Sequence, residues 1–307
     1  MSERRYSITR PGRRVELGLA LGGGGMKGWA HVGLIEVLEE YGLRPDRIAG
    51  CSAGAIMGAA YAYGMPVEEM LRIMREQDTS NFFTLHLNGQ SLLNWEGFRQ
   101  SLVALYGDTR LEDLPIPFSV VCTDLETGQE VVLEEGPLVD AILASSAVPG
   151  IFPPVKVGDR LLVDGGLVNN VPVSVLARQG ATYIIASKLH RQYDEEGVLK
   201  RKGTSSGRLQ RMERVLSRFW RETREFPTAF AVMSRSLDIL MAQLEHIRLQ
   251  MYTPDVVICP QLEDISSFGF AENKEEIYLR GRAAALEASD ALLRLAERLE
   301  EENEEAT

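Results

Sequence analysis

Short apolar runs and segments with helical spacing alternate along the first part of the chain. Val15–Leu21 is an apolar run that ends at four glycines, and it predicts a buried strand. Apolar residues then recur at helical spacing, which predicts a helix over Gly28–Tyr41. Arg47–Gly50 predicts a second strand, and the small apolar residues of Ala55–Tyr63 predict a helix buried against a sheet.

The same alternation continues to the end of the chain. Helices are predicted over Val67–Gln77, Trp95–Tyr106, Leu138–Ser145, Val173–Gln179 and Glu275–Glu302. Strands are predicted over Phe118–Thr123, Glu130–Leu133, Leu161–Val163, Thr182–Leu189 and Asp255–Cys259. Strands that alternate with helices indicate an α/β fold of three layers, α/β/α, with a mostly parallel central sheet.

Residues 190–206 interrupt this rhythm, because they are polar and contain glycine. Two helices, at about 207–225 and 228–250, follow them. We interpret 190–253 as a loop and helical insertion, or flap, near the C-terminal third of a single domain that spans 15–302. Residues 1–14 are predicted to form a basic arm without fixed structure, and 303–307 belong to a like-charged acidic end that is expected to be disordered.

Composition narrows the functional classes. The 307 residues carry a net charge of −11, which argues against a nucleic-acid partner. No apolar run approaches the roughly 18 residues of a membrane span, and no apolar segment follows the basic N-terminus as in a signal peptide. Cys51, Cys122 and Cys259 lack zinc-type spacing, so we expect buried thiols, no metal and a cytoplasmic protein.

Gly50-Cys51-Ser52-Ala53-Gly54 is a G-x-S-x-G segment between a predicted strand and a predicted helix. A nucleophilic serine needs a sharp turn of this kind, and the glycines relieve crowding around it. The following helix directs its N-terminal amides at the site, which favours negative charge. A second match, Gly203–Gly207, follows Lys200-Arg201-Lys202 instead of an apolar strand, so it is interpreted as a flexible loop.

Four glycines precede Met26-Lys27-Gly28 at the turn from the first strand to the first helix. Their amides can point at the carbonyl oxygen of an ester and form an oxyanion hole. Gly23-x-Gly25-x-x-Gly28 also matches a dinucleotide-binding fingerprint. That fold needs an acidic residue after the second strand, where this chain has the Ser52 turn, and Asp46 lies before the strand.

Asp164-Gly165-Gly166 directly follows a predicted strand. A carboxylate at the carboxyl end of a strand lies at the edge where open α/β sheets place their sites. An ordinary Asp-Gly turn is an equally good interpretation of this segment taken alone.

In this order, the three motifs resemble those of the patatin-like phospholipases. GGGGMKG, GCSAG and DGG carry the resemblance, and His31-Val32-Gly33, the segment from Thr123 to Gly128, SSAVPGIFPPV at 145–155 and PDVVICP at 254–260 extend it. It covers about 15–190 well and 254–290 moderately, as in small bacterial members.

The resemblance implies a catalytic dyad with Ser52 as nucleophile and Asp164 as general base, without a catalytic histidine, a metal or a cofactor. It places the oxyanion and substrate-binding loop at Gly23, Gly24 and Gly25, with Lys27 at the basic position of the loop. It further implies acyl-ester hydrolysis of phospholipids, lysophospholipids or neutral esters.

Asp is a poor base at neutral pH, since its ordinary pKa is about 3.9, and we expect partial burial to raise the pKa of Asp164. A Ser–His–Asp triad is the alternative. It would use His190, which follows a predicted strand, whereas His31, His86 and His246 are interpreted as packed or solvated.

The predicted helix at 207–225 has an apolar stripe flanked by arginines. A helix packed on the core with a solvated basic face is the favoured interpretation, and peripheral contact with the inner membrane face is the alternative. Two other functions also stay open for the whole chain. It could be a Rossmann-type nucleotide-binding protein, or a regulatory protein on this fold that has lost turnover.

Overall fold

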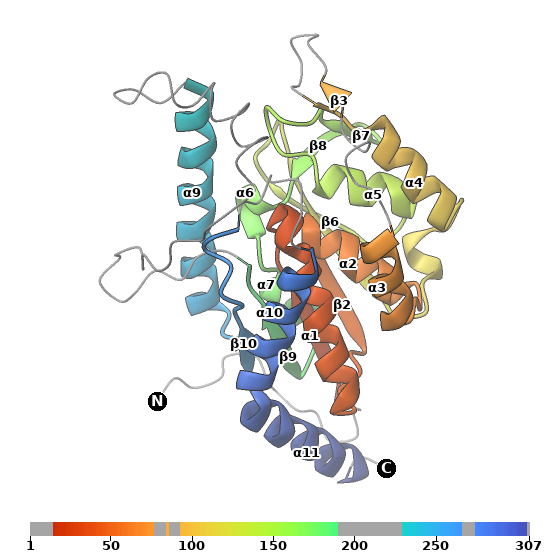
Figure 1. Ribbon diagram of the computed structural model, residues 1–307, viewed down its shortest axis with the longest axis vertical. Helices are drawn as coiled ribbons and strands as arrows, with labels where there is room; N and C mark the ends of the chain where they lie inside the picture. The colour runs from red at the N-terminus through yellow and green to blue at the C-terminus, as the bar shows by residue number, and fades with distance from the viewer. Residues whose placement is uncertain (1–14, 77–83, 86–92, 190–228, 266–273, 306–307) are drawn as a thin grey trace.

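A central sheet organises the computed structural model, which describes residues 15–76, 84–85, 93–189, 229–265 and 274–305 (Figure 1). Its strands are β1 (Leu17–Leu21), β2 (Arg47–Cys51), β5 (Phe118–Asp124), β6 (Glu130–Leu133), β7 (Val155–Val157), β8 (Arg160–Asp164), β9 (Tyr183–Ser187) and β10 (Val256–Ile258). A separate antiparallel pair consists of β3 (Thr84–Leu85) and β4 (Leu93–Asn94), which the sequence pattern did not indicate.

The strand order is β10-β9-β1-β2-β5-β8-β7, with β6 paired to β5. The five strands from β10 to β5 are parallel, so their carboxyl ends share one edge. β8 and β6 both run antiparallel to β5, and β7 runs antiparallel to β8. The sheet is therefore mostly parallel, as expected, with antiparallel pairing beyond β5.

Helices cover both faces of this sheet. They are α1 (Trp29–Glu40), α2 (Ala53–Ala62), α3 (Val67–Glu76), α4 (Glu96–Tyr106), α5 (Leu138–Ser145), α6 (Gly166–Asn169), α7 (Val173–Gln179), α9 (Ala229–Met251), α10 (Lys274–Glu287) and α11 (Ser289–Glu305). Short 3-10 turns, η1 (Gly25–Gly28) and η3 (Leu111–Asp113), connect some of them.

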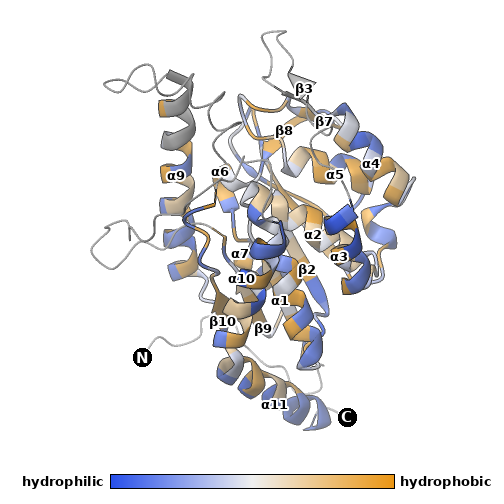
Figure 2. Ribbon diagram, viewed as in Figure 1, coloured by the Kyte–Doolittle hydropathy of each residue, from blue (hydrophilic) through white to orange (hydrophobic). Residues whose placement is uncertain are grey.

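Side chains that alternate along each strand feed two separate cores. Leu19 of β1 packs in the larger core with α1, α2, α5 and α10, whereas Ala20 packs in the smaller core with Val175 of α7. α2 is apolar almost all round, as Figure 2 shows, because it lies between the sheet and other helices. The three-layer α/β/α fold is thus confirmed.

The C-terminal region differs from expectation in two ways. The single helix predicted over Glu275–Glu302 is two helices, α10 and α11, that part at Ala288. The Ala288 amide bonds to the Ala285 carbonyl in a tightened last turn, and Ser289 is a residue type favoured at helix starts. The acidic end is helical to Glu305 rather than disordered, and Asn303 Oδ1 accepts a hydrogen bond from the Val15 amide at 3.1 Å.

The insertion is described only in part. The helix expected at about 228–250 is α9, which packs against α6. The segment 190–228, with the expected basic helix at 207–225, lies outside the described residues, as do the arm 1–14 and residues 306–307.

Candidate active site

Ser52 occupies a strained turn between β2 and α2. Its φ of 52° and ψ of −117° make it the only non-glycine residue with a positive φ in the part of the chain that the structure describes. Such a conformation costs about 1–3 kcal/mol and persists only where the surroundings enforce it. A Cβ on Gly50 would lie 2.5 Å from the Gly54 carbonyl oxygen, and one on Gly54 would overlap the Leu21 carbonyl. Both glycines are therefore required for the turn.

Ser145, at the end of α5, holds this turn from behind. Its Oγ accepts a hydrogen bond from the Ser52 amide at 2.8 Å and donates one to the Val121 carbonyl at 2.6 Å. Ser145 is fully buried, so neither backbone group has water as an alternative partner. Ser145 begins the SSAVPG segment of the sequence, but that segment does not by itself predict these two hydrogen bonds.

Asp164 ends β8 and lies beside the same turn. Its Oδ1 accepts a hydrogen bond from the Gly166 amide at 2.7 Å and lies 3.8 Å from the Cys51 Sγ, which donates to it. Its main-chain oxygen accepts from the Thr123 hydroxyl at 2.8 Å. The residue is 3% exposed. Backbone and side-chain contacts thus fix the carboxylate next to the residue that precedes Ser52.

The strand that delivers Asp164 runs in the direction opposite to the one assumed from sequence. β8 is antiparallel to β5 and descends from the carboxyl edge, and its register places Asp164 opposite Cys122. The chain then passes so close to β5 that a Cβ on Gly165 would overlap the Val121 carbonyl. Asp164 therefore reaches the predicted edge of the sheet, but by a different route.

Two buried thiols lie beside this carboxylate. Burial, and then the charge of Asp164, raise the pKa of Cys51 and of Cys122 well above the usual range. Both thiols are therefore protonated at neutral pH, and Cys51 can act as a donor to Asp164. Cys259 is half-buried rather than buried, unlike the expectation for all three cysteines.

The glycine loop follows β1 and approaches Ser52 from the other side. Its first two amides are already bonded, since Gly22 donates to the Ser187 carbonyl at 2.9 Å and Gly23 to the Asn170 carbonyl at 3.3 Å. The Gly24 and Gly25 amides donate to no backbone carbonyl of the described residues. Gly25 also begins η1, where amides have no partner within the helix, and its φ of 59° suits glycine.

The loop residues therefore differ in what they can contribute. The Gly23 amide is bonded to the Asn170 carbonyl, and Gly23 provides space, since a Cβ there would lie 3.1 Å from the Ser52 Cβ. The role of the Gly24 and Gly25 amides as an oxyanion hole stays a prediction. Lys27 is 6% exposed. The pKa of Asp264 is lowered first by the Arg280 hydrogen bond and to a smaller extent by the charge of Lys27, which shows that Lys27 lies near Asp264.

His31 of α1 supports the base of the glycine loop. Its Nε2 lies 2.8 Å from the Gly22 carbonyl oxygen and its Nδ1 2.9 Å from the Ser187 Oγ. Burial lowers the pKa of His31 to about 4, so the ring is neutral at pH 7. A neutral ring can satisfy the carbonyl only by carrying its proton on Nε2, and Nδ1 then accepts from Ser187. His31 is thus a structural residue, as interpreted from sequence.

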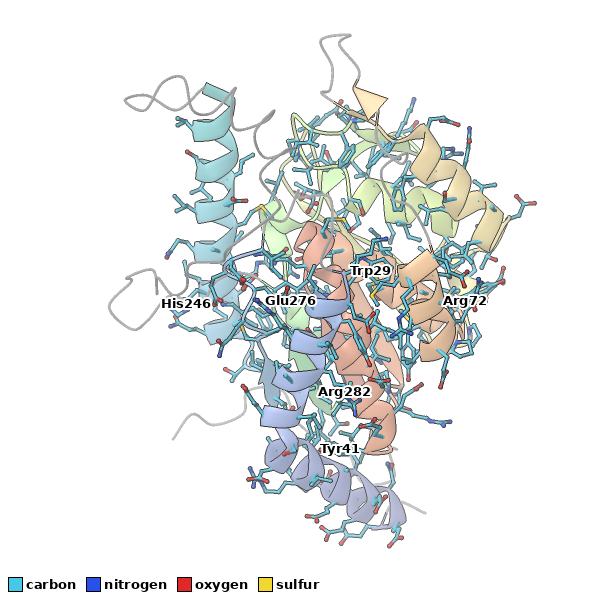
Figure 3. The ribbon with its side chains drawn as sticks, in the orientation of Figure 1. Trp29, Tyr41, Arg72, His246, Glu276 and Arg282 are labelled. Carbon is cyan, nitrogen blue, oxygen red and sulfur yellow. The ribbon has the colours of Figure 1, made fainter. Side chains whose placement is uncertain are left out.

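Of the other three histidines, His246 is the one that lies in a described segment. His246 projects from α9 at the left of the molecule and is exposed, with Gln250 as its neighbour (Figure 3). His86 and His190, the histidine of the triad alternative, lie outside the described residues. Within the described ranges, no group of three or more His, Cys, Asp or Glu side chains is arranged to hold a metal ion.

The residues that form this site lie within a segment that matches a known protein family. The sequence profile of the patatin-like phospholipases matches residues 19–177, which span the glycine loop, the Ser52 turn and Asp164. The chain belongs to the patatin-like phospholipase family. The glycines that also match a dinucleotide-binding fingerprint therefore lie within the segment that matches this family. Asp46, the acidic residue before the second strand, accepts a hydrogen bond from the Leu17 amide at 2.8 Å.

Several family members are similar to large parts of the chain. An uncharacterized NTE family protein of Mycobacterium tuberculosis is 37% identical over 182 residues, 58% of this chain and 31% of the relative. A lysophospholipase of Debaryomyces hansenii is 28% identical over 277 residues, 88% of this chain and 18% of the relative. The neuropathy target esterase of Drosophila melanogaster is 32% identical over 189 residues, 59% of this chain and 13% of the relative. The chain spans less than half the length of these relatives.

A solved structure supports the fold. VipD from Legionella pneumophila superposes with a TM-score of 0.58 at 15% identity and covers 90% of this chain and 67% of its own. Among the described helices, none combines the length and the hydrophobicity that a transmembrane segment requires.

Proposed function

We propose that the protein is a serine acyl hydrolase that cleaves carboxylic esters of lipids with Ser52 as nucleophile and Asp164 as general base. The strained turn at Ser52 supports this proposal most strongly. It contacts Asp164 through Cys51 on one side and the glycine loop through Gly23 on the other. An ordinary turn has no need of a strained serine at this junction.

The first half of the reaction transfers the acyl group to the enzyme. The hydrogen bonds from the Gly166 amide and the Cys51 thiol to Asp164 Oδ1 hold the carboxylate in place, and this carboxylate takes the Ser52 proton. Ser52 Oγ then attacks the ester carbonyl carbon, and the carbonyl oxygen becomes an oxyanion held by the Gly24 and Gly25 amides. The carbon–oxygen bond breaks, the alcohol leaves with the proton from Asp164, and an acyl-serine remains.

The second half returns the enzyme to its starting state. Asp164 removes a proton from water, and the resulting hydroxide attacks the acyl carbon. The Ser52 oxygen leaves as the carboxylic acid forms and takes the proton back. A raised pKa for Asp164 stays a prediction. A pH–rate profile tests this, because an acidic limb that stays near the ordinary value of about 4 would contradict it.

The names of two relatives support a choice of substrates to test first. One similar protein is named a lysophospholipase and another a neuropathy target esterase. We therefore place lysophospholipids and related acyl esters first in a substrate panel, followed by diacyl phospholipids and short-chain nitrophenyl esters.

Covalent labelling by a fluorophosphonate, followed by the substrate panel, tests the proposal. The unaltered protein should label and turn over, Ser52→Ala should do neither, and Asp164→Asn should lose about 10²–10⁴-fold in kcat. Ser205→Ala is the matched control, because it removes the serine of the second G-x-S-x-G. Labelling that survives in Ser52→Ala would refute the assignment, and labelling without turnover would favour the regulatory alternative.

Peripheral membrane contact is a second and separate proposal. It is based on the apolar stripe and the arginines of 207–225, which lie outside the described residues. Deletion of 200–225 should abolish binding to anionic vesicles and leave hydrolysis of a soluble ester intact. Unchanged vesicle binding would contradict the membrane interpretation.

A further inference from the structure

Asn170 lies between the glycine loop and the Asp164 turn. Its Oδ1 is 2.6 Å from the position that a Cβ on Gly23 would occupy and 3.1 Å from the corresponding position on Gly166. Its main-chain oxygen accepts the Gly23 amide. Asn170 is 2% exposed. One buried carboxamide therefore packs against both loops that flank Ser52.

A buried ion pair determines how this carboxamide is oriented. Asn170 Nδ2 donates to Glu245 Oε2 at 2.6 Å, and Lys188 Nζ lies 3.0 Å from Glu245 Oε1. The Glu245 side chain is fully buried and that of Lys188 is 12% exposed. An ionised carboxylate only accepts hydrogen bonds, so the amide nitrogen must face Glu245. The amide oxygen is then turned toward Gly23 and Gly166.

The ion pair connects α9 to the candidate active site. Glu245 belongs to α9. Met241 of the same helix packs against Gly166, since a Cβ on Gly166 would overlap the Met241 Cε. Lys188 follows Ser187, whose carbonyl accepts the Gly22 amide. The desolvation cost of a buried ion pair is offset only when the geometry of the pair is well defined. Such a pair is therefore suited to hold a neighbouring group in place.

We infer that Asn170 is a positioning residue and that Glu245 and Lys188 act through it to keep the glycine loop and the Asp164 turn at the spacing the reaction needs. This inference rests on the proposed hydrolase function. Glu245 lies on a helix beyond the segment 19–177 that the family profile matches. Docking of α9 therefore completes a site whose motifs all come from other elements.

Two double variants separate positioning from simple stability. Glu245→Gln with Lys188→Met removes both charges and keeps an acceptor for Asn170. Glu245→Leu with Lys188→Met removes the same charges and also the acceptor. Both replace the ion pair by neutral groups, so neither leaves a buried unpaired charge. Asp238→Asn, a carboxylate-to-amide change elsewhere on α9, is the single-site control.

We expect the Gln/Met variant to keep kcat within a few-fold of the unaltered protein. The Leu/Met variant should lose up to about 10²-fold in kcat for a soluble ester, with KM little changed, because the loss is in alignment rather than in binding. Hydrogen exchange at the Gly22 and Gly23 amides, which are hydrogen-bonded to Ser187 and Asn170, should be faster in the Leu/Met variant alone. Asp238→Asn should change none of these values.

Equal kcat and equal exchange rates in the two double variants would overturn the inference. The failure of the proposed function would look different, because the unaltered protein would then show no turnover that depends on Ser52. In that case the exchange rates alone decide whether Asn170 and its partners hold the glycine loop.

Discussion

Replacing Ser145 with Ala should slow the reaction of Ser52, the candidate nucleophile, although Ser52 itself is unchanged. The hydroxyl of Ser145 is shared by the Ser52 amide and the Val121 carbonyl, at 2.8 and 2.6 Å. Alanine leaves both backbone groups buried and without that partner. Ser146→Ala makes the same chemical change one residue later. The Ser146 hydroxyl is buried and has no hydrogen-bond partner among the described residues, so it is a matched control.

The size of the effect follows from the buried groups. Each buried backbone group that loses its partner costs about 1–3 kcal/mol, and partial relaxation brings the expected loss of unfolding free energy for Ser145→Ala to about 2–4 kcal/mol. The strain stored at Ser52, about 1–3 kcal/mol, then favours rotation of the turn away from its present conformation. Ser146→Ala should change stability by less than about 1 kcal/mol.

Urea unfolding and the rate of fluorophosphonate labelling measure the two consequences separately. Ser145→Ala should lower the urea midpoint and slow labelling by about 10–10²-fold at a temperature where the variant is fully folded. Ser146→Ala should match the unaltered protein in both assays. Equal labelling rates for the two variants would show that Ser52 keeps its conformation without Ser145, and the reasoning would be refuted.

Three further predictions concern other parts of the fold. Because the pKa of His31 is about 4 in the folded protein against 6.5 in the unfolded chain, its contribution to stability is complete above pH 6.5 and falls by up to about 3 kcal/mol as the pH drops to 4; unfolding curves of His31→Gln should lack this component. Gly281→Ala should lower the free energy of unfolding by about 1–3 kcal/mol, since its Cβ would overlap the Ala30 carbonyl where α1 meets α10; an unchanged urea midpoint would contradict this. Iodoacetamide should modify Cys259 in the native protein and leave Cys51 and Cys122 unmodified, because burial raises the pKa of both thiols; the mass of the alkylated peptides checks this.

Elements with clear local signals could be predicted to the residue. α7 spans Val173–Gln179 as expected, because Pro172 precedes it and Gly180 ends it with a φ of 89°. α5 follows Pro137 in the same way. The break between α10 and α11 was not predicted, because Ser289 is a weak signal within a run of residues that otherwise favour helix. Strand direction was also inaccessible, because the side-chain pattern of β8 is the same in parallel and antiparallel pairing.

The candidate site divides along the same line. Its motifs specify local backbone conformation, with glycines where a Cβ would collide and a serine at a sharp turn. Such motifs can be recognised from neighbouring residues alone. Ser145 and Asn170 contribute through hydrogen bonds across 93 and 75 positions of the chain. The residues next to Ser145 and Asn170 in the sequence do not indicate such distant hydrogen-bond partners.

Glu245 shows what this means for function. On a helix with exposed polar residues at many positions, a glutamate is by default a solvated surface residue. Here its side chain is fully buried against Lys188 and bonded to Asn170, so the charge is held in place by groups from two other parts of the chain. The distance between the glycine loop and the Asp164 turn therefore depends on residues that no motif contains. Under the proposed function, we therefore expect substitutions in α9 to change turnover while every motif residue stays the same.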